Sequence, residues 1–380
     1  MDSDILVIGA GPAGLAVAAT LIAKGCRPLV IEKAGSVGAS WRGHYERLHL
    51  HTVKTLSALP GMAFAKELPR YVPRQGVVDY LAAYAARARV EPQFGVEATA
   101  IAREGDGWRT TTRSGQTIRS RIVIVTTGAN QQPNVPELEG QLEFAATILH
   151  SRDYRNAAPF AGRRVLVVGM GNTGAEIALD LAEHGVAATL SVRSPVNVVL
   201  RDVLGRPTQK TSIALSWLPT PVGDAVARFL ANVSVGDIER LGLRRSPISP
   251  LRELRELGRT PVIDVGTLAR IRSGEIGVRP GIRRLHRGSV EFVDGGVAPI
   301  DAIVLATGYR AGIEALFAGT PVPVDANGLP SQLAGEGPLA GVYFVGFDTR
   351  QPGGLLRTIA AQAIAVAGRI CNTPAAPRTA

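Results

Sequence analysis

The feature that most constrains the fold is a strand, a glycine-rich turn and a helix that occur in this order twice in the chain. Apolar residues 5–8 and 165–168 have the length of buried strands, and alanine-rich stretches over 15–24 and 175–184 have helical character. Between strand and helix each copy carries the pattern GxGxxG, built from Gly9, Gly11, Pro12, Ala13 and Gly14 in the first copy and from Gly169, Gly171, Asn172, Thr173 and Gly174 in the second. This order predicts two nucleotide-binding units.

The two copies also end alike. Apolar residues 122–125 run into Thr-Thr-Gly128, and apolar residues 302–305 run into Ala306-Thr307-Gly308. Between the glycine-rich turn and this end, alternating segments near 97–103 and 108–113 in one half, and near 276–285 and 289–293 in the other, predict antiparallel strands. We therefore expect an α/β fold of two Rossmann-like dinucleotide-binding domains, each with an inserted antiparallel β-meander.

The domains are not expected to be continuous in sequence. Residues 341–347 and 355–369 predict a further strand and helix after the second copy, so the chain returns to complete the first domain. We expect a first domain over 1–155 and 310–380 and a second domain over 156–309. A proline-containing insertion at about 195–272 is either a cover for an active site or a packing elaboration.

Composition excludes several classes of protein. The net charge of +10 comes from arginines scattered along the chain, without a basic tail or helix, so nucleic-acid binding is not expected. No uninterrupted apolar run is long enough to span a membrane. Cys26 and Cys371 form no CxxC pair and no metal-ligand spacing, which predicts separate thiols, a reducing cytoplasmic location and no bound metal.

The residue that ends the second strand of each copy indicates which nucleotide is bound. In the first copy this strand ends at Glu32, followed by Lys33; a carboxylate there accepts both ribose hydroxyls, which allows FAD or NAD. In the second copy the strand ends at Arg193 and Ser194, which suit a 2′-phosphate and favour NADPH over NADH.

Two nucleotides in one chain imply hydride transfer between them, and FAD is the electron acceptor that fits the Glu32 site. A disulfide reductase of this architecture would need a CxxC pair, which the sequence lacks. Molecular oxygen is the remaining common oxidant, and it requires no further redox group in the protein.

The sequence resembles the flavin-containing monooxygenases, and within them the YUCCA-like branch of plant indole-3-pyruvate monooxygenases and their bacterial relatives. The resemblance rests on residues 41–54 (WRGHYERLHLHTVK), on residues 260–266 (TPVIDVG), on Phe144, His150, Ser151 and Tyr154 of an FxGxxxHxxxY signature, and on residues 305–309 (LATGY) in place of FATGY. It covers nearly the whole chain. Ala146 stands where the signature has glycine, and Leu305 where FATGY has phenylalanine.

The resemblance implies a class B monooxygenase in which NADPH reduces FAD, the reduced flavin adds O2 at C4a, and the (hydro)peroxyflavin oxygenates a small substrate. It implies His51 and Lys54 as candidate catalytic residues, with His51 hydrogen-bonding near C4a or N5 of the flavin. Besides the two glycine-rich turns, it implies cofactor contacts from Glu32, Lys33, Trp41, His51, Thr52, Gly128, Gly346, Phe347, Gly354 and Leu355, and from His150, Ser151, Arg193, Ser194, Ala306, Thr307, Gly308 and Tyr309.

For the substrate, the branch favours oxidative decarboxylation of an α-keto acid such as indole-3-pyruvate. N- or S-oxygenation and Baeyer–Villiger oxidation stay open, as do an NADPH-dependent flavin reductase that passes electrons to a partner and a nucleotide-binding scaffold without turnover. The expected partners are a small-molecule substrate and O2. The sequence does not specify an oligomeric state, and a homodimer is compatible with it.

Overall fold

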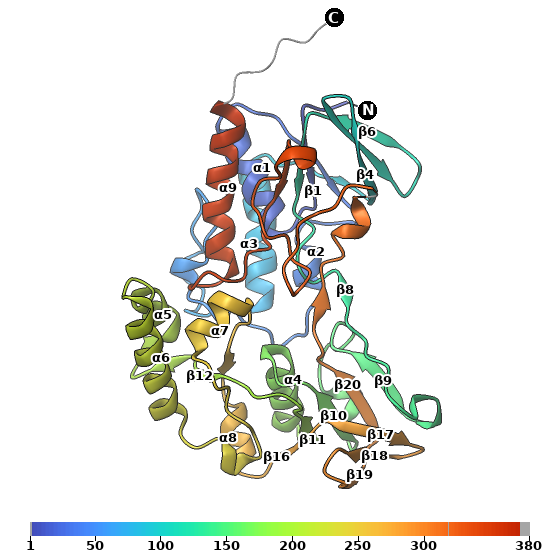
Figure 1. Ribbon diagram of the computed structural model, residues 1–380, viewed down its shortest axis with the longest axis vertical. Helices are drawn as coiled ribbons and strands as arrows, with labels where there is room; N and C mark the ends of the chain where they lie inside the picture. The colour runs from blue at the N-terminus through green and yellow to red at the C-terminus, as the bar shows by residue number, and fades with distance from the viewer. Residues whose placement is uncertain (1, 318, 373–380) are drawn as a thin grey trace, which may run out of the picture. The chain divides into compact units, whose positions relative to one another are not determined.

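The computed structural model describes residues 2–317 and 319–372, and these residues form two compact units (Figure 1). Unit 1 takes the described residues of 1–42, 52–132 and 310–380, and unit 2 takes 43–51 and 133–309. The short strands β8 (Gln132–Pro133) and β21 (Tyr309–Arg310) carry the chain from one unit to the other. The first domain was expected to run to residue 155, whereas residues 43–51 and 133–155 fall in unit 2.

Unit 1 is built on a parallel five-stranded sheet with the strand order β22-β7-β1-β2-β3. Its central strand β1 lies between β2 and β7, and both β1 and β7 are buried on every residue, as expected for a parallel sheet covered on both faces. The strands are β1 (Ile5–Ile8), β2 (Leu29–Glu32), β3 (Gln93–Phe94), β7 (Ile122–Val125) and β22 (Val342–Phe344).

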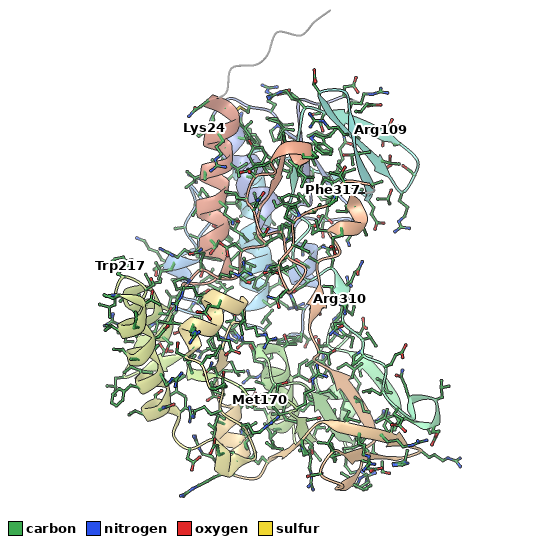
Figure 2. The ribbon with its side chains drawn as sticks, in the orientation of Figure 1. Lys24, Arg109, Met170, Trp217, Arg310 and Phe317 are labelled. Atoms are coloured by element: carbon green, nitrogen blue, oxygen red, sulfur yellow. A yellow bond between two sulfur atoms is a disulfide. The ribbon has the colours of Figure 1, made fainter. Side chains whose placement is uncertain are left out.

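Helices and a small meander complete unit 1. The helix α9 (Leu355–Asn372) runs beside α1 (Pro12–Ala23), and α3 (Arg74–Arg87) also packs on α1 (Figure 1). The antiparallel meander is β4 (Ala98–Glu104), β5 (Gly107–Thr112) and β6 (Thr117–Ser120). Its buried Trp108 meets Phe317 edge to face, and both belong to one hydrophobic core with residues of β1 and β7. Phe317 is labelled in Figure 2. The short α2 (Ala39–Arg42) leads out of the unit.

Unit 2 repeats the plan with a parallel sheet of order β16-β11-β10-β20-β9. Its elements are β9 (Thr147–His150), β10 (Arg164–Val168), α4 (Asn172–Glu183), β11 (Ala187–Ser191), β16 (Ile276–Arg279) and β20 (Ala302–Leu305). Residues 133–155 belong to this unit because β9 pairs with β20 along its full length. The predicted segment 276–285 divides, since β16 joins the parallel sheet and only the later strands form the meander, β17 (Ile282–His286), β18 (Ser289–Phe292) and β19 (Val297–Pro299).

The insertion near 195–272 is a helical layer of unit 2. Its elements are β12 (Val198–Leu200), β13 (Asp202–Val203), β14 (Arg206–Pro207), α5 (Thr208–Leu215), α6 (Thr220–Val235), α7 (Pro250–Leu257), β15 (Val262–Asp264) and α8 (Thr267–Arg272). Helix α6 buries small residues at four-residue spacing, Gly223, Ala227 and Ala231, and it packs on β12 and α5. The close approach at Gly223 is to α5, because a Cβ there would lie 2.7 Å from the carbonyl oxygen of Leu215. Trp217, just before α6, is 84% exposed (Figure 2).

The two expected domains of α/β type with inserted meanders are confirmed, but the expectation of separate thiols is wrong. Cys26 and Cys371 form a disulfide with Cα atoms 6.6 Å apart. The pairing arises because α9 returns beside α1 and brings its last turn to the loop that follows α1. Among the helices of the described residues, none combines the length and the apolar character needed to cross a membrane.

Candidate functional site

The glycine-rich turn of unit 1 is packed tightly on one side and open on the other. A Cβ at Gly14 would lie 1.8 Å from the carbonyl oxygen of Gly9, so only glycine lets α1 approach β1 this closely. A Cβ at Gly11 would meet no atom within 4 Å. Gly11 caps the N-terminus of α1, and Pro12 occupies the first turn, where its missing N–H is not needed. The open space therefore lies at the positive end of α1, where an anion is stabilised.

Thr126 packs against the glycine-rich turn at Gly9, a contact that the sequence analysis did not predict. Its buried hydroxyl lies 2.8 Å from the carbonyl oxygen of Ile8 and 3.1 Å from that of Gly9. The signal was the Thr-Thr-Gly that ends β7. Gly128 closes this segment with φ +82°, a conformation that glycine adopts without strain.

Glu32 ends β2 beside the glycine-rich turn. Its carboxylate accepts hydrogen bonds from the backbone N–H groups of Ala10 (2.7 Å) and Ala34 (2.9 Å). These bonds fix the carboxylate at the carboxyl edge of the parallel sheet, which is where a ribose is recognised in this architecture. The neighbouring Lys33 donates to Gln131 Oε1 at 2.7 Å.

The segment after β22 approaches the same turn within unit 1. A Cβ at Gly346 would lie 2.9 Å from Cβ of Ala13, and one at Gly354 would lie 2.6 Å from the methyl carbon of Thr52. Both glycines have positive φ, +90° and +91°. The structure thus brings Ala13 together with Gly346, and Thr52 together with Gly354 and the N-terminus of α9 at Leu355.

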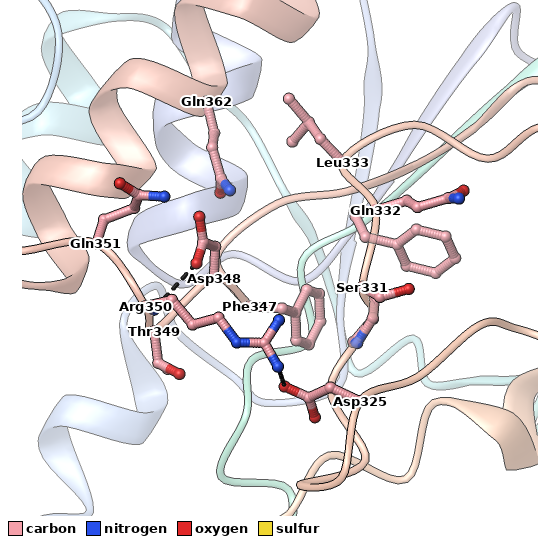
Figure 3. A pocket seen from close by; sticks show the side chains of 12 residues that line it. Asp325, Ser331, Gln332, Leu333, Phe347, Asp348, Thr349, Arg350, Gln351 and Gln362 are labelled. Atoms are coloured by element: carbon pink, nitrogen blue, oxygen red, sulfur yellow. Dashed lines mark hydrogen bonds and ion pairs between the residues drawn. The ribbon is translucent and has the colours of Figure 1, made fainter. Parts of the chain in front are cut away.

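A cavity of about 250 Å³ is lined in part by residues 347–351 of this segment (Figure 3). Phe347 and Arg350 line it together with Gln362 of α9. The Arg350 guanidinium donates to Asp325 at 2.7 Å, while its Nε, which is buried, has no hydrogen-bond partner among the described residues. Phe347 therefore faces a polar hollow and is itself buried.

Trp41 and Lys54 flank the segment that passes into unit 2 and back. Trp41 lies in α2 and is half-buried. The Lys54 ammonium donates to the backbone carbonyls of Ala65 (3.1 Å), Lys66 (2.7 Å) and Leu68. All three of its protons are used to hold this loop, which gives Lys54 a structural role; its catalytic role stays a prediction.

The glycine-rich turn of unit 2 follows the same geometry. A Cβ at Gly174 would lie 2.0 Å from the carbonyl oxygen of Gly169, and one at Gly171 would meet nothing within 4 Å. Ala306 takes the place that Thr126 has in unit 1, with its carbonyl oxygen 2.7 Å from a Cβ at Gly169. Met170, within the turn, is buried in the core (Figure 2).

Asn172, at the start of α4, is used within the protein. Its side chain donates to the carbonyl of Pro261 at 3.1 Å and accepts from the backbone N–H of Ile263 at 2.7 Å. It therefore ties residues 260–266 to the turn, and Thr173 beside it is half-buried.

Arg193 and Ser194 follow β11 and are exposed. A second arginine from the insertion, Arg244, donates to the carbonyl oxygen of Arg193. The backbone at Arg193 is thus fixed, while its position after the second strand is the one where a 2′-phosphate is recognised.

His150, Ser151 and the 306–309 segment form a hydrogen-bonded cluster in unit 2. His150 donates from Nε2 to the carbonyl of Gly308 (3.1 Å) and accepts at Nδ1 from the N–H of Arg152 (3.1 Å). Burial lowers the pKa of His150, in agreement with this neutral form.

The 306–309 segment makes further contacts in unit 2. The Tyr309 ring stands edge-on to the His150 ring, with ring centroids 4.9 Å apart, and burial raises the pKa of Tyr309. Thr307 donates to the carbonyl of Asn134 at 2.5 Å.

His51 ends the segment 43–51, which belongs to unit 2. Its Nε2 hydrogen-bonds to Glu176 Oε1 of α4, and the Glu176 side chain is only 3% exposed. Sequence reasoning missed Glu176; the signal was an acid inside the apolar helical run Ala175, Ile177, Ala178. Thr52, the next residue in the chain, belongs to unit 1.

Comparison with known proteins identifies the family. Residues 6–203 match the model of the pyridine nucleotide-disulphide oxidoreductase family. Indole-3-pyruvate monooxygenase YUCCA1 of Oryza sativa subsp. japonica is 39% identical over 93% of this chain and 88% of its own. Indole-3-pyruvate monooxygenase YUCCA6 of Arabidopsis thaliana is 39% identical over 91% of this chain and 85% of its own.

A solved structure shows the same fold. The flavin-containing monooxygenase from Stenotrophomonas maltophilia superimposes with a TM-score of 0.73 over 97% of this chain and 98% of its own, at 23% sequence identity. In both units of the present structure the open space before the helix and the group at the end of the second strand fit a dinucleotide. The chain therefore belongs to the flavin-containing monooxygenases, in their YUCCA branch, and is a monooxygenase that uses FAD and NADPH.

Proposed function

We propose that this enzyme oxidatively decarboxylates an α-keto acid of the indole-3-pyruvate kind. The observation that carries the proposal is the extent of the similarity to proteins named as indole-3-pyruvate monooxygenases, which runs over 93% of the chain for the rice enzyme and is not confined to the glycine-rich turns. In the balanced reaction the keto acid, O2, NADPH and a proton give the carboxylic acid one carbon shorter, CO2, NADP⁺ and water.

Unit 1 is proposed to hold FAD. Gly11 leaves the space for a pyrophosphate at the N-terminus of α1, and the carboxylate of Glu32 accepts the ribose hydroxyls. The N-terminus of α9 at Leu355, close to Thr52 through Gly354, stabilises negative charge on the ligand. When bound, FAD supplies hydride acceptance from NADPH and activation of O2.

Unit 2 is proposed to hold NADPH. Gly171 leaves the corresponding space before α4, and Arg193 and Ser194 receive the 2′-phosphate. His150 and Ser151 support the 306–309 segment beside this site through the bond from His150 to Gly308. No acid–base triad is required of the chain, whose residues bind, orient and exclude water.

His51 is the proposed catalytic side chain, acting as a hydrogen-bonding group toward the reacting ligands. Its Nε2 is already used by Glu176, so the interaction with a ligand falls to Nδ1. Imidazole suits this position because one nitrogen can donate while the other accepts.

The test measures NADPH consumption, H2O2 release and oxygenated product together, with panels of aromatic α-keto acids, amines, sulfides and ketones as substrates. The proposal expects a decarboxylated acid that carries one atom of ¹⁸O from ¹⁸O2, with little H2O2. An oxygenated amine, sulfide or ester without product from any keto acid would overturn the substrate class. NADPH consumption that yields only H2O2, or reduces an added acceptor, with every panel would instead indicate a flavin reductase.

A further inference from the structure

A buried carboxylate on α4 is held by one short segment of unit 2. Glu176 Oε1 accepts from His51 Nε2, and its Oε2 lies 3.9 Å from Nη1 of Arg47. Burial, reinforced by the charge of the Glu176 carboxylate, raises the pKa of the Tyr45 hydroxyl well above its usual range. A carboxylate this deeply buried needs such partners, so segment 43–51 and α4 are matched to one another.

Arg47 does not depend on Glu176 for a partner. Its guanidinium forms two parallel bonds to Glu183, Nε to Oε2 at 2.9 Å and Nη2 to Oε1 at 2.8 Å. The bidentate pair already ties segment 43–51 to the far end of α4. The direct hydrogen bond of Glu176 goes to the His51 side chain. Because the Arg47–Glu183 pair already holds segment 43–51 against α4, Glu176 is not needed to fix the backbone of that segment.

The other ring nitrogen of His51, Nδ1, takes no part in the bond to Glu176. His51 Nδ1 is buried and has no hydrogen-bond partner among residues 2–317 and 319–372. A neutral imidazole has one N–H and one lone pair, and the acceptor-only carboxylate takes the N–H at Nε2. A buried acceptor without a hydrogen bond is destabilising, so such an atom is expected to meet a donor when the ligands are bound.

We propose that Glu176 is the positioning residue of His51: it fixes the Nε2-protonated tautomer and the ring orientation, and so reserves the Nδ1 lone pair for a donor N–H or O–H of the reacting ligands. This inference rests on the proposed role of His51 and adds to it the residue that controls it. Because Glu176 lies on a regular helix that starts at the glycine-rich turn, its carboxylate is placed by the same rigid element.

The first test reads the tautomer directly. Long-range ¹H–¹⁵N NMR spectra of ¹⁵N-histidine-labelled holoenzyme with FAD and NADP⁺ show which ring nitrogens carry a proton, and His51→Gln identifies the signals of His51. We expect a protonated Nε2 and an unprotonated Nδ1, and a mixture of tautomers in Glu176→Ala. A proton at Nδ1 in the wild-type enzyme, with or without one at Nε2, would overturn the proposal, as would an unchanged His51 spectrum in Glu176→Ala.

The second test separates positioning from structure by means of a matched control. Glu183→Gln removes another carboxylate of the same helix that also contacts segment 43–51, through Arg47, and that does not touch His51. We expect Glu176→Ala and Glu176→Gln to lower the turnover number about 10–100-fold, as loss of an orienting partner does, with the dissociation constant of NADP⁺ changed less than about twofold. Glu183→Gln should keep both the His51 spectrum and the turnover.

Equal losses in turnover for the Glu176 and Glu183 variants would reduce Glu176 to a structural residue and refute the inference. The outcome for the proposed function is separate. If His51→Gln oxygenates substrate as fast as the wild type, the catalytic role of His51 fails, whereas the wild-type tautomer still decides whether Glu176 sets the protonation of the ring.

Discussion

Alanine substitutions at two glycines of the unit 2 turn should have different effects. Gly174→Ala should lower stability, and Gly171→Ala should weaken nucleotide binding. A Cβ at Gly174 would lie 2.0 Å from the carbonyl oxygen of Gly169 and 3.1 Å from Cβ of Ala306. The turn after β10 and the helix α4 must therefore move apart by roughly 1 Å. Overpacking of this kind costs about 1–3 kcal/mol. For a unit of this size the melting temperature falls by about 2–4 °C per kcal/mol, which predicts a loss of about 2–12 °C for Gly174→Ala.

Gly171→Ala should leave the fold intact and weaken NADPH binding. A Cβ at Gly171 meets no atom within 4 Å, and the backbone is extended, with φ −84° and ψ −175°, which alanine adopts readily. The free energy of unfolding should change by no more than about 0.5 kcal/mol. Because the added methyl group occupies the space assigned to the pyrophosphate, the dissociation constant of NADP⁺, which carries the same pyrophosphate, should rise at least about tenfold, or about 1.4 kcal/mol.

Calorimetric melting of the FAD-loaded protein without NADP⁺, and titration of each variant with NADP⁺, measure the two effects separately. A melting temperature of Gly174→Ala equal to that of the wild type would show that the added Cβ causes no overpacking. The reasoning is refuted if Gly171→Ala binds NADP⁺ with unchanged affinity, because the space before α4 would then not be the pyrophosphate site.

Three further predictions concern the ribose phosphate, a buried imidazole and the disulfide. Arg193→Ala should raise the dissociation constant of NADPH about 10–150-fold, the value of a charged hydrogen bond, and leave NADH binding nearly unchanged; equal losses would show that Arg193 does not meet the 2′-phosphate. The lowered pKa of His150 means that the unfolded chain takes up the proton first, so the free energy of unfolding should fall as the pH drops below about 6.5, and less so in His150→Gln; parallel urea-denaturation curves between about pH 7.5 and 5.5 would contradict this. Cys371→Ser should lower the free energy of unfolding by about 2–4 kcal/mol and abolish its dependence on reductant, and unchanged stability would argue against a disulfide with Cys26 in solution.

The sequence alone determined the repeated architecture, because the signals for it are local. An apolar strand, a GxGxxG turn and an alanine-rich helix lie within about 20 consecutive residues, so β1 with α1 and β10 with α4 could be placed before any tertiary contact was known. The residues proposed to recognise the two nucleotides, Glu32 and Arg193, were identified from the same short-range order. The proposed substrate class rests on similarity that covers 93% of the chain.

The tertiary structure decided what depends on residues far apart in the chain. It moved residues 43–51 and 133–155 into unit 2, because Arg47 pairs with α4 and β9 pairs with β20. It joined Cys26 to Cys371 across a sequence separation of 345, where spacing alone predicted two separate thiols. It also placed Glu176 against His51. No local pattern specifies such contacts, because they are fixed by how helices and strands pack, and packing is a property of the complete fold.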